Sequence, residues 1–190
     1  MEKSNIINTT ISDLPAIYDL YDKAIAYQKS RNFPVWNGYD KRVLHEEIEN
    51  KSQYKILIDN QLAAIFSACQ PGHVEAELWQ ERAQKKAIYL HRIIVNRDFK
   101  GQKIFAQILQ WTEEFIAGKS YQYIRMDTWA DNPTLIDYYK SFGFEEAGIG
   151  YTSDSEDLPS QYRKVKIIMM EKTAGHLTAS ARPHIPAAGS

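Results

Sequence analysis

The segment 87–95, AIYLHRIIV, constrains the fold more than any other part of the chain. Its apolar residues occupy both alternating sets of positions, so a strand made from it would be buried on both faces. Such a strand lies inside a sheet whose two faces are covered, and helices are the usual cover. The segment therefore predicts a central strand in a protein that mixes α and β structure.

The rest of the chain alternates between strand and helix patterns around this segment. Further strands are predicted at 5–10, 54–58, 62–69, 123–128, 144–151 and 165–170. Helices are predicted over about four turns from residue 14, and at 40–49, 100–118 and 132–142. Asp59 and Asn60 indicate a hairpin between two of the strands, and the last two strands are expected to pair antiparallel. Residues 71–86 are polar and fit either a short helix or an excursion over a site.

The composition argues against several classes of function. The chain has 190 residues and a net charge of −1, which favours neither nucleic acid nor an anionic membrane as a partner. No apolar run approaches the roughly 18 residues of a transmembrane helix, and the N-terminus lacks a signal pattern. The single cysteine, Cys69, fits a reducing cytoplasm and is interpreted as a small core residue.

We expect one domain over residues 1–172, because the length suits a single core. Residues 173–190 are small, contain proline and glycine, and show no periodicity. They are therefore predicted to be a disordered tail or a cloning remnant.

A polar turn at 96–103, NRDFKGQK, connects the central strand to a predicted helix. A strand that runs into a helix N-terminus directs several free backbone N–H groups and the positive end of the helix dipole at one point. That arrangement suits a phosphate group, and Lys100 and Lys103 add positive charge. The physical signal is general, because many strand–turn–helix units bind no ligand.

Two motifs give this region a more specific meaning. Residues 90–102, LHRIIVNRDFKGQ, resemble the strand-to-helix motif of the GNAT acetyltransferases, and residues 127–144, DTWADNPTLIDYYKSFGF, resemble the second motif of that family. In the second motif Asn132 begins a helix, Tyr139 follows seven residues later, and a Gly-Phe pair follows after four more. The resemblance implies the GNAT acyl-CoA N-acyltransferase fold, an α+β architecture with a mixed central sheet of six to seven strands and about four flanking helices.

The first motif departs from the family pattern, Gln/Arg-x-x-Gly-x-Gly/Ala. Lys100 takes its first position, Lys103 the position of the first glycine, and Phe105 that of the second. Glycine lets the backbone approach a pyrophosphate closely and tolerates positive φ. The missing glycines leave open an alternative, a degenerate domain that serves as a non-catalytic CoA-binding or regulatory module.

The resemblance implies acetyl-CoA as co-substrate and no metal. Ile93 and Val95 would offer backbone groups to the pantetheine arm, where the central strand splays from its neighbour. Asn132 would cap its helix and reach the cofactor. The backbone N–H groups from residue 101 to 106 would bind the pyrophosphate. The turn and helix start assigned to the cofactor are Lys100, Gly101, Gln102, Lys103, Ile104, Phe105 and Ala106.

By the same resemblance Tyr139 would protonate the departing thiolate, because a tyrosine pKa near 10 lies closer to that of a thiol than a carboxylic acid does. His91 occupies the place where the arylalkylamine acetyltransferases, which this strand resembles, have a histidine that helps deprotonate the amine. A base with a pKa near 6.5 suits that task. Glu75 and Glu77 are the competing bases.

The acceptor is predicted to be a primary amine, either a small molecule or a peptide, that receives the acetyl group by direct transfer. Aromatic residues are the candidates for its pocket, with Trp36 and Trp129 preferred over Tyr27, Tyr39 and Trp79. A homodimer fits the family. A Rossmann-type nucleotide site is disfavoured, because no G-x-G-x-x-G follows a predicted strand.

Overall fold

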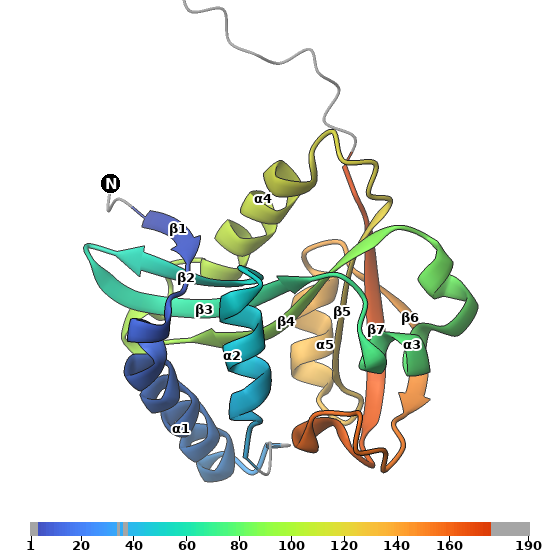
Figure 1. The fold of residues 1–190 in the computed structure, drawn as a ribbon, viewed down its shortest axis with the longest axis horizontal. Coiled ribbons are helices and arrows are strands. Elements are labelled where there is room, and N and C mark those ends of the chain that lie inside the picture. The colour runs from blue at the N-terminus through green and yellow to red at the C-terminus, as the bar shows by residue number, and fades with distance from the viewer. Residues whose placement is uncertain (1–3, 34, 36–37, 176–190) are drawn as a thin grey trace, which may run out of the picture.

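Seven strands form one mixed sheet with helices on both faces (Figure 1). The computed structural model describes residues 4–33, 35 and 38–175. The strands are β1 (Ser4–Asn8), β2 (Gln53–Ile58), β3 (Gln61–Cys69), β4 (Ala87–Val95), β5 (Tyr123–Trp129), β6 (Glu145–Tyr151) and β7 (Lys166–Thr173). The helices are α1 (Leu14–Ser30), α2 (Lys41–Glu49), α3 (His73–Trp79), α4 (Ile104–Ile116) and α5 (Pro133–Lys140).

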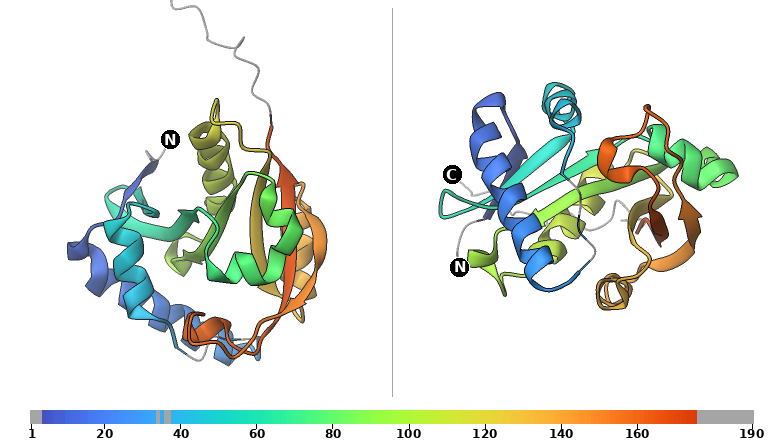
Figure 2. Two further views of the ribbon diagram at one scale, coloured as in Figure 1. Left: turned by 45° about the vertical axis from the view of Figure 1, so that its right-hand side comes forward. Right: turned by 90° about the horizontal axis from the view of Figure 1, so that it is seen from below.

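The sheet order is β1-β2-β3-β4-β5-β7-β6. β4 and β5 pair in parallel, and the other neighbouring strands pair antiparallel. Seen from below, α1 and α2 lie on one side of the sheet and α4 and α5 on the other (Figure 2). The predicted mixed sheet of six to seven strands, with 87–95 as an interior strand, is confirmed.

Local sequence signals explain where the elements begin and turn. The Asp40 carboxylate accepts a hydrogen bond from the Arg42 N–H (2.9 Å) and caps α2, as the sequence predicts. Asp59 and Asn60 have φ values of +48° and +63°, the left-handed pair that a type I′ hairpin requires. They join β2 to β3 as expected.

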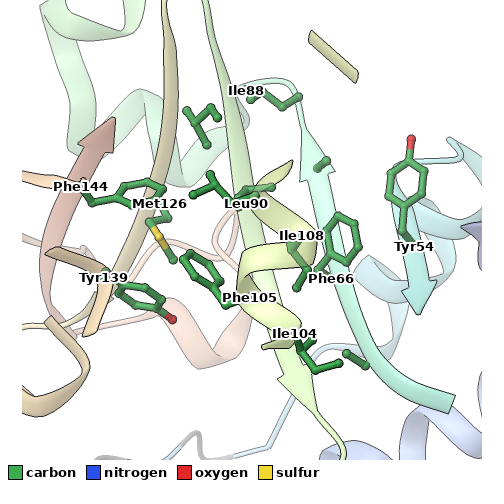
Figure 3. Packing of buried hydrophobic residues seen from close by; sticks show 14 of the residues in the cluster. Tyr54, Phe66, Ile88, Leu90, Ile104, Phe105, Ile108, Met126, Tyr139 and Phe144 are labelled. Carbon is green, nitrogen blue, oxygen red and sulfur yellow. The ribbon is translucent and has the colours of Figure 1, made fainter. Parts of the chain in front are cut away.

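The central strand packs its two faces into different parts of the core. Ile88 and Leu90 belong to the cluster under α4 and α5, which Figure 3 shows in close-up. Ala87 and Tyr89, which alternate with them, face the cluster that includes Val74 and Trp79 of the α3 region. This alternation is the period-2 pattern of a strand buried on both sides.

β4 and β5 separate part-way along their length. Their register begins at Ala87 and ends where Leu90 pairs with Met126. Beyond that point β4 carries a β-bulge, because its register with β3 shifts and Arg92 has a φ of +51°. A bulge bends a strand and increases its twist, so it turns the end of β4 away from β5 and opens a gap in the sheet.

Several predicted features differ from the structure in their extent or number. The helix expected from residue 100 begins at Ile104, because residues 97–99 form a separate 3-10 turn. The ambiguous segment 71–86 contains α3, so the described residues have five α-helices rather than about four. β7 runs to Thr173, and Ala174 is still buried, so ordered chain extends past the expected boundary at 172. Most of the predicted tail, from residue 176, lies outside the described residues.

Candidate active site

Three cavities adjoin one another across the gap between β4 and β5. A cavity of about 750 Å³, the outer cavity, lies between α2, the start of α3 and the β6–β7 connection. A central cavity of about 110 Å³ lies in the gap itself. A third cavity of about 660 Å³, here called the helix-start cavity, lies between α1, the end of β4 and the start of α5. His91 and Arg92 line both the outer and the central cavity, and Ile93 lines both the central and the helix-start cavity.

The end of β4 presents backbone groups to this gap. The Asn96 N–H donates to the Ala63 carbonyl of β3 at 2.8 Å. Along a strand, the backbone N–H and C=O groups of successive residues point alternately to the neighbour on one side and to the neighbour on the other. The backbone groups of Ile94 therefore face β3, and those of Ile93 and Val95 face the gap. This is the placement expected for groups that bind an extended ligand.

The turn before α4 keeps the backbone conformation of a glycine-containing motif, although lysine stands at the first glycine position. Lys103 has a φ of +51° and Gly101 a φ of +94°, so Lys103 adopts the conformation for which glycine is the usual residue. The first bond into the helix runs from the Gln107 N–H to the Lys103 carbonyl (3.2 Å). The N–H groups of residues 104–106 therefore have no partner within α4 and can bind an anion.

One of the expected donors, the Gln102 N–H, is not available, and neither is the N–H of the preceding Lys100. The Gln102 N–H donates to the Phe99 carbonyl (3.2 Å), and the Lys100 N–H donates to the Arg97 carbonyl (3.1 Å). The prediction that every N–H from 101 to 106 faces the anion is therefore wrong at Gln102, because the 3-10 turn uses it. The Lys100 and Lys103 side chains are exposed.

Phe105 does not occupy the space in front of the helix N-terminus. Its side chain is buried in the core beside Tyr139 (Figure 3), with the two ring centres 5.1 Å apart. Its ring centre lies 4.9 Å from that of Phe142. The aromatic ring thus fills the space between α4 and α5. The loss of glycine at this position therefore leaves the N-terminal end of α4 unobstructed.

Tyr139 lies on α5 with its side chain in the core and lines the central cavity. Burial raises its pKa well above the usual value near 10, and the neighbouring Tyr138 and Asp127 raise it further. Tyr138 is instead 44% exposed and lines the helix-start cavity. Tyr139 is thus a protonated hydroxyl at the place where the strands part.

Asn132 begins α5 and caps it, since its side-chain oxygen accepts the Leu135 N–H at 3.2 Å. The same residue lines the helix-start cavity. The capping role is confirmed, and the cofactor contact stays a prediction.

His91 lies between two carboxylates on the wall shared by the outer and central cavities. Its Nε2 is 2.9 Å from Glu75 Oε1, and its Nδ1 is 3.5 Å from Asp127 Oδ1. Glu75 comes from α3 and Asp127 from β5, and all three side chains are less than 8% exposed. The Glu75 carboxylate also accepts the Gly72 N–H (2.6 Å), which caps α3.

These contacts keep His91 positively charged. Burial alone would lower the pKa of His91, but Glu75 and Asp127 outweigh it and raise the pKa to about 10. Burial likewise would raise the pKa of Glu75, and the charge of His91 lowers it instead. The role of base predicted for His91 requires a pKa near 6.5. That premise is wrong here, because two carboxylates surround the ring.

The same three residues place ligand atoms within 4.8 Å of one another. The two carboxylates, however, contact opposite nitrogens of one imidazole. A metal ion held by all three residues would replace the proton on one ring nitrogen and draw the carboxylate at the other nitrogen away from it, so both contacts would be lost. The geometry suits an imidazolium held by two anions.

A second buried ion pair lies beside this one. The Arg92 guanidinium binds Glu47 of α2 through two nitrogens, one of them Nε at 2.9 Å. Glu47 also accepts the Ser67 hydroxyl at 2.7 Å and lies 3.3 Å from the Cys69 thiol. Burial raises the pKa of Cys69 to about 11, so this cysteine is a protonated wall residue of the outer cavity rather than a nucleophile.

Comparison with known proteins identifies the family. Residues 15–144, more than half of the chain, match the Acetyltransferase (GNAT) family. The chain belongs to the GNAT acetyltransferases. It is 30% identical over 164 residues to the uncharacterized N-acetyltransferase YesJ of Bacillus subtilis (strain 168), and the match covers 78% of this chain and 91% of YesJ.

Solved GNAT structures share the fold. A GNAT-family acetyltransferase from Listeria monocytogenes matches with a TM-score of 0.71 and 23% identity, over 90% of this chain and 94% of that one. Ard1 from Thermoplasma volcanium matches with a TM-score of 0.63 and 11% identity, over 91% and 99%. The ribosomal-protein-S18-alanine N-acetyltransferase of Escherichia coli matches with a TM-score of 0.54 and 16% identity, over 96% and 100%.

Not every residue that the sequence nominated in this GNAT chain lies at the cavities. Glu75 lines the outer cavity and Trp129 the central one. Glu77 instead binds the backbone N–H and the hydroxyl (2.9 Å) of Ser153 on the β6–β7 connection, so its nomination as a base is not supported. Trp36 lies outside the described residues.

The other nominated aromatics divide between core and cavity. Tyr27 lines the helix-start cavity with the Arg97 guanidinium 3.6 Å from its ring centre. Tyr39 stacks on Tyr21 with ring centres 4.3 Å apart. Trp79 is a buried residue 4.4 Å from the guanidinium of Arg125.

Sequence reasoning missed several residues of the GNAT site. Asp127 stands inside the second motif, but nothing in the sequence shows that it faces His91 across the gap. Tyr162 of the β6–β7 connection is buried and lines both the outer and the central cavity. Arg92 follows His91 directly, and only the bulge brings both side chains to the same cavities.

The described part of the chain has no helix long and apolar enough to cross a membrane.

Proposed function

We propose that this GNAT protein transfers an acetyl group from acetyl-CoA directly to a primary amine. The observation that carries the proposal is the series of three adjoining cavities across the β4–β5 gap, with Tyr139 at the middle one. Two substrates entering from opposite ends would meet at the central cavity, which suits direct transfer without an acyl-enzyme. Cys69 does not serve as a covalent carrier, because its thiol is protonated.

In this mechanism the helix-start cavity holds acetyl-CoA. Its pantetheine arm follows the backbone of Ile93 and Val95, and its pyrophosphate extends beyond that cavity, whose lining does not include residues 100–106, to the free N–H groups at the start of α4. Donors at the gap would stabilise the oxyanion that forms as the amine attacks the thioester carbonyl. The C–S bond then breaks, and Tyr139 gives its proton to the departing thiolate.

The amine must lose a proton before or during its attack. His91 does not take it at neutral pH, because the ring nitrogens already hold their protons. Water or a carboxylate is the acceptor, and Glu75 is the carboxylate of this group that lines the outer cavity. His91 then acts as a positioning residue that holds Glu75 in place. We further propose a cytoplasmic site of action, which suits a chain whose single cysteine is unpaired.

Replacing Tyr139 by phenylalanine tests the acid assignment. The ring and its packing remain while the proton donor is lost, so kcat is expected to fall about 100-fold, with acetyl-CoA affinity preserved. The measurement is CoA release with an amine panel, together with calorimetric titration of acetyl-CoA. Tyr138→Phe is the matched control, one residue away and on the cofactor side. Unchanged kcat in Tyr139→Phe would remove Tyr139 from the mechanism.

The alternative is a degenerate domain that binds CoA without transferring acetyl groups, which Lys103 and Phe105 at the two glycine positions leave open. Calorimetric titration of the full chain with acetyl-CoA, followed by a turnover assay with amines, distinguishes the enzyme from the degenerate domain. Micromolar binding followed by turnover supports the enzyme. Binding without transfer to any amine supports the module.

A further inference from the structure

The buried charges around the central cavity do not cancel. Two cations and three anions meet where the outer and central cavities join, and each of their side chains is less than 10% exposed. The cations are His91 and Arg92, and the anions are Glu47, Glu75 and Asp127. Other charged residues that line the two cavities are exposed. This part of the molecule therefore carries one more negative than positive charge.

A buried excess charge is costly unless a partner neutralises it. Arg92 binds Glu47 through two nitrogens, and that pair balances itself. His91 is shared between Glu75 and Asp127, so one positive charge serves two carboxylates. The missing cation belongs beside these carboxylates, where the cavities open to a ligand.

The proposed acetyl transfer brings a cation to this place, because a primary amine arrives as an ammonium at neutral pH. Resting on that proposed function, we propose that the acceptor is a monocationic amine with an uncharged body, whose ammonium binds at the Glu75–His91–Asp127 cluster.

The outer cavity fits the uncharged body of such an amine. Its exposed charged residues balance, with three basic and three acidic side chains. They are Arg42, Lys51, Lys119, Glu46, Glu156 and Asp157. A second ammonium would therefore find no matching excess of negative charge. Tyr54, Phe115, Tyr121 and Tyr162 add aromatic surface to the same wall, which suits an alkyl or aryl group.

A substrate panel tests this inference through turnover. Hexylamine and phenethylamine carry one charge, whereas hexane diamine has the same chain as hexylamine and a second ammonium. The inference predicts that kcat/KM for hexylamine exceeds that for hexane diamine by about tenfold or more. Equal values, or preference for the diamine, would overturn it while leaving acetyl transfer to amines intact.

A binding experiment tests the charge requirement without turnover. Phenethylamine and its neutral analogue phenylethanol are titrated into the protein saturated with CoA, and the dissociation constants are compared. The amine is expected to bind about tenfold more tightly or better. If one of the carboxylates were protonated, the excess charge would vanish and the two ligands would bind alike, which would refute the inference.

The variant Glu75→Gln tests whether the preference for the amine arises at the Glu75–His91–Asp127 cluster. The substitution removes the excess negative charge and keeps the shape of the side chain, so the preference for phenethylamine over phenylethanol is expected to fall to about threefold or less. Glu49→Gln, an exposed glutamate of α2 outside the cavities, should keep the full preference. Asp127→Asn replaces Glu75→Gln if thermal melting shows that the latter does not fold. Because binding is measured, amine binding without any acetylation would refute the proposed function alone.

Discussion

Replacing His91 by glutamine removes the one cation that two buried carboxylates share. Glutamine keeps a polar side chain of similar reach, but it leaves Glu75 and Asp127 facing each other without a counter-ion. Both carboxylates are about 6% exposed, so water does not replace the lost charge. The variant is therefore expected to be less stable at neutral pH, although it removes no apolar contact of the main core.

The size of the loss follows from the pKa. A rise from 6.5 to about 10 corresponds to a preference of about 5 kcal/mol for the charged form in the folded state. This is an upper limit, since a carboxylate can bind a proton once the cation is gone. Loss of one partner from a buried ion pair costs about 3–5 kcal/mol, and we expect about 3 kcal/mol for His91→Gln at pH 7.

The direction in which the stability contribution of His91 changes with pH distinguishes this residue from the carboxylates. Its folded pKa is raised, so its contribution is complete below about pH 6.5 and is lost as the pH rises through about 10. The difference in the free energy of unfolding between wild type and variant should therefore close towards about pH 10.5. Besides these carboxylates, Arg92 and the parallel ring of Tyr89 lie near the imidazole.

Urea unfolding at several pH values measures this difference. His73→Gln is the matched control, because His73 is exposed at the start of α3, and it should change the free energy of unfolding by less than about 0.5 kcal/mol. Tyrosine ionisation at high pH affects the control and the variant equally. A His91→Gln protein within about 1 kcal/mol of wild type at pH 7, with the same pH profile, would refute the charged-imidazole account.

Three further outcomes follow from the same geometry. Lys103→Gly should stabilise the chain by about 0.5–1 kcal/mol in urea unfolding, because glycine relieves the left-handed φ; a loss of stability would contradict this. Asn132→Ala and Asp40→Ala should each cost about 1 kcal/mol as lost caps, and calorimetry should show weaker acetyl-CoA binding for Asn132→Ala alone. Acetyl transfer should show no pH–rate inflection near 6.5, and an inflection there that His91→Gln abolishes would restore His91 as the base.

Much of the fold follows from short-range sequence signals. The strand at 87–95, the Asp59-Asn60 hairpin and the caps at Asp40 and Asn132 each depend on residues that are close in sequence, and each is found. The helix predicted from residue 100 began four residues late, because local propensity does not separate a 3-10 turn from a first helical turn.

The electrostatics of the site could not be predicted in this way. Glu75 and Asp127 approach His91 from 16 residues before it and 36 residues after it, and the contact requires both α3 and the splayed end of β5. From sequence alone His91 has an ordinary pKa and suits a base. Tertiary contacts turn it into a fixed cation, and they make Asp127, which no motif role assigned, part of the site.

Lys103 and Phe105, which replace the two glycines of the first GNAT motif, show which property of that motif the fold needs. At position 103 the backbone is left-handed although the residue is lysine, so the conformation persists without glycine. At position 105 the side chain enters the core, where its ring packs against Tyr139 and Phe142. A side chain directed into the core does not obstruct a ligand at the helix N-terminus. The two departures therefore change the stability of the turn and the packing beneath Tyr139, while the N–H groups of residues 104–106 keep no partner within α4, as the proposed pyrophosphate site requires.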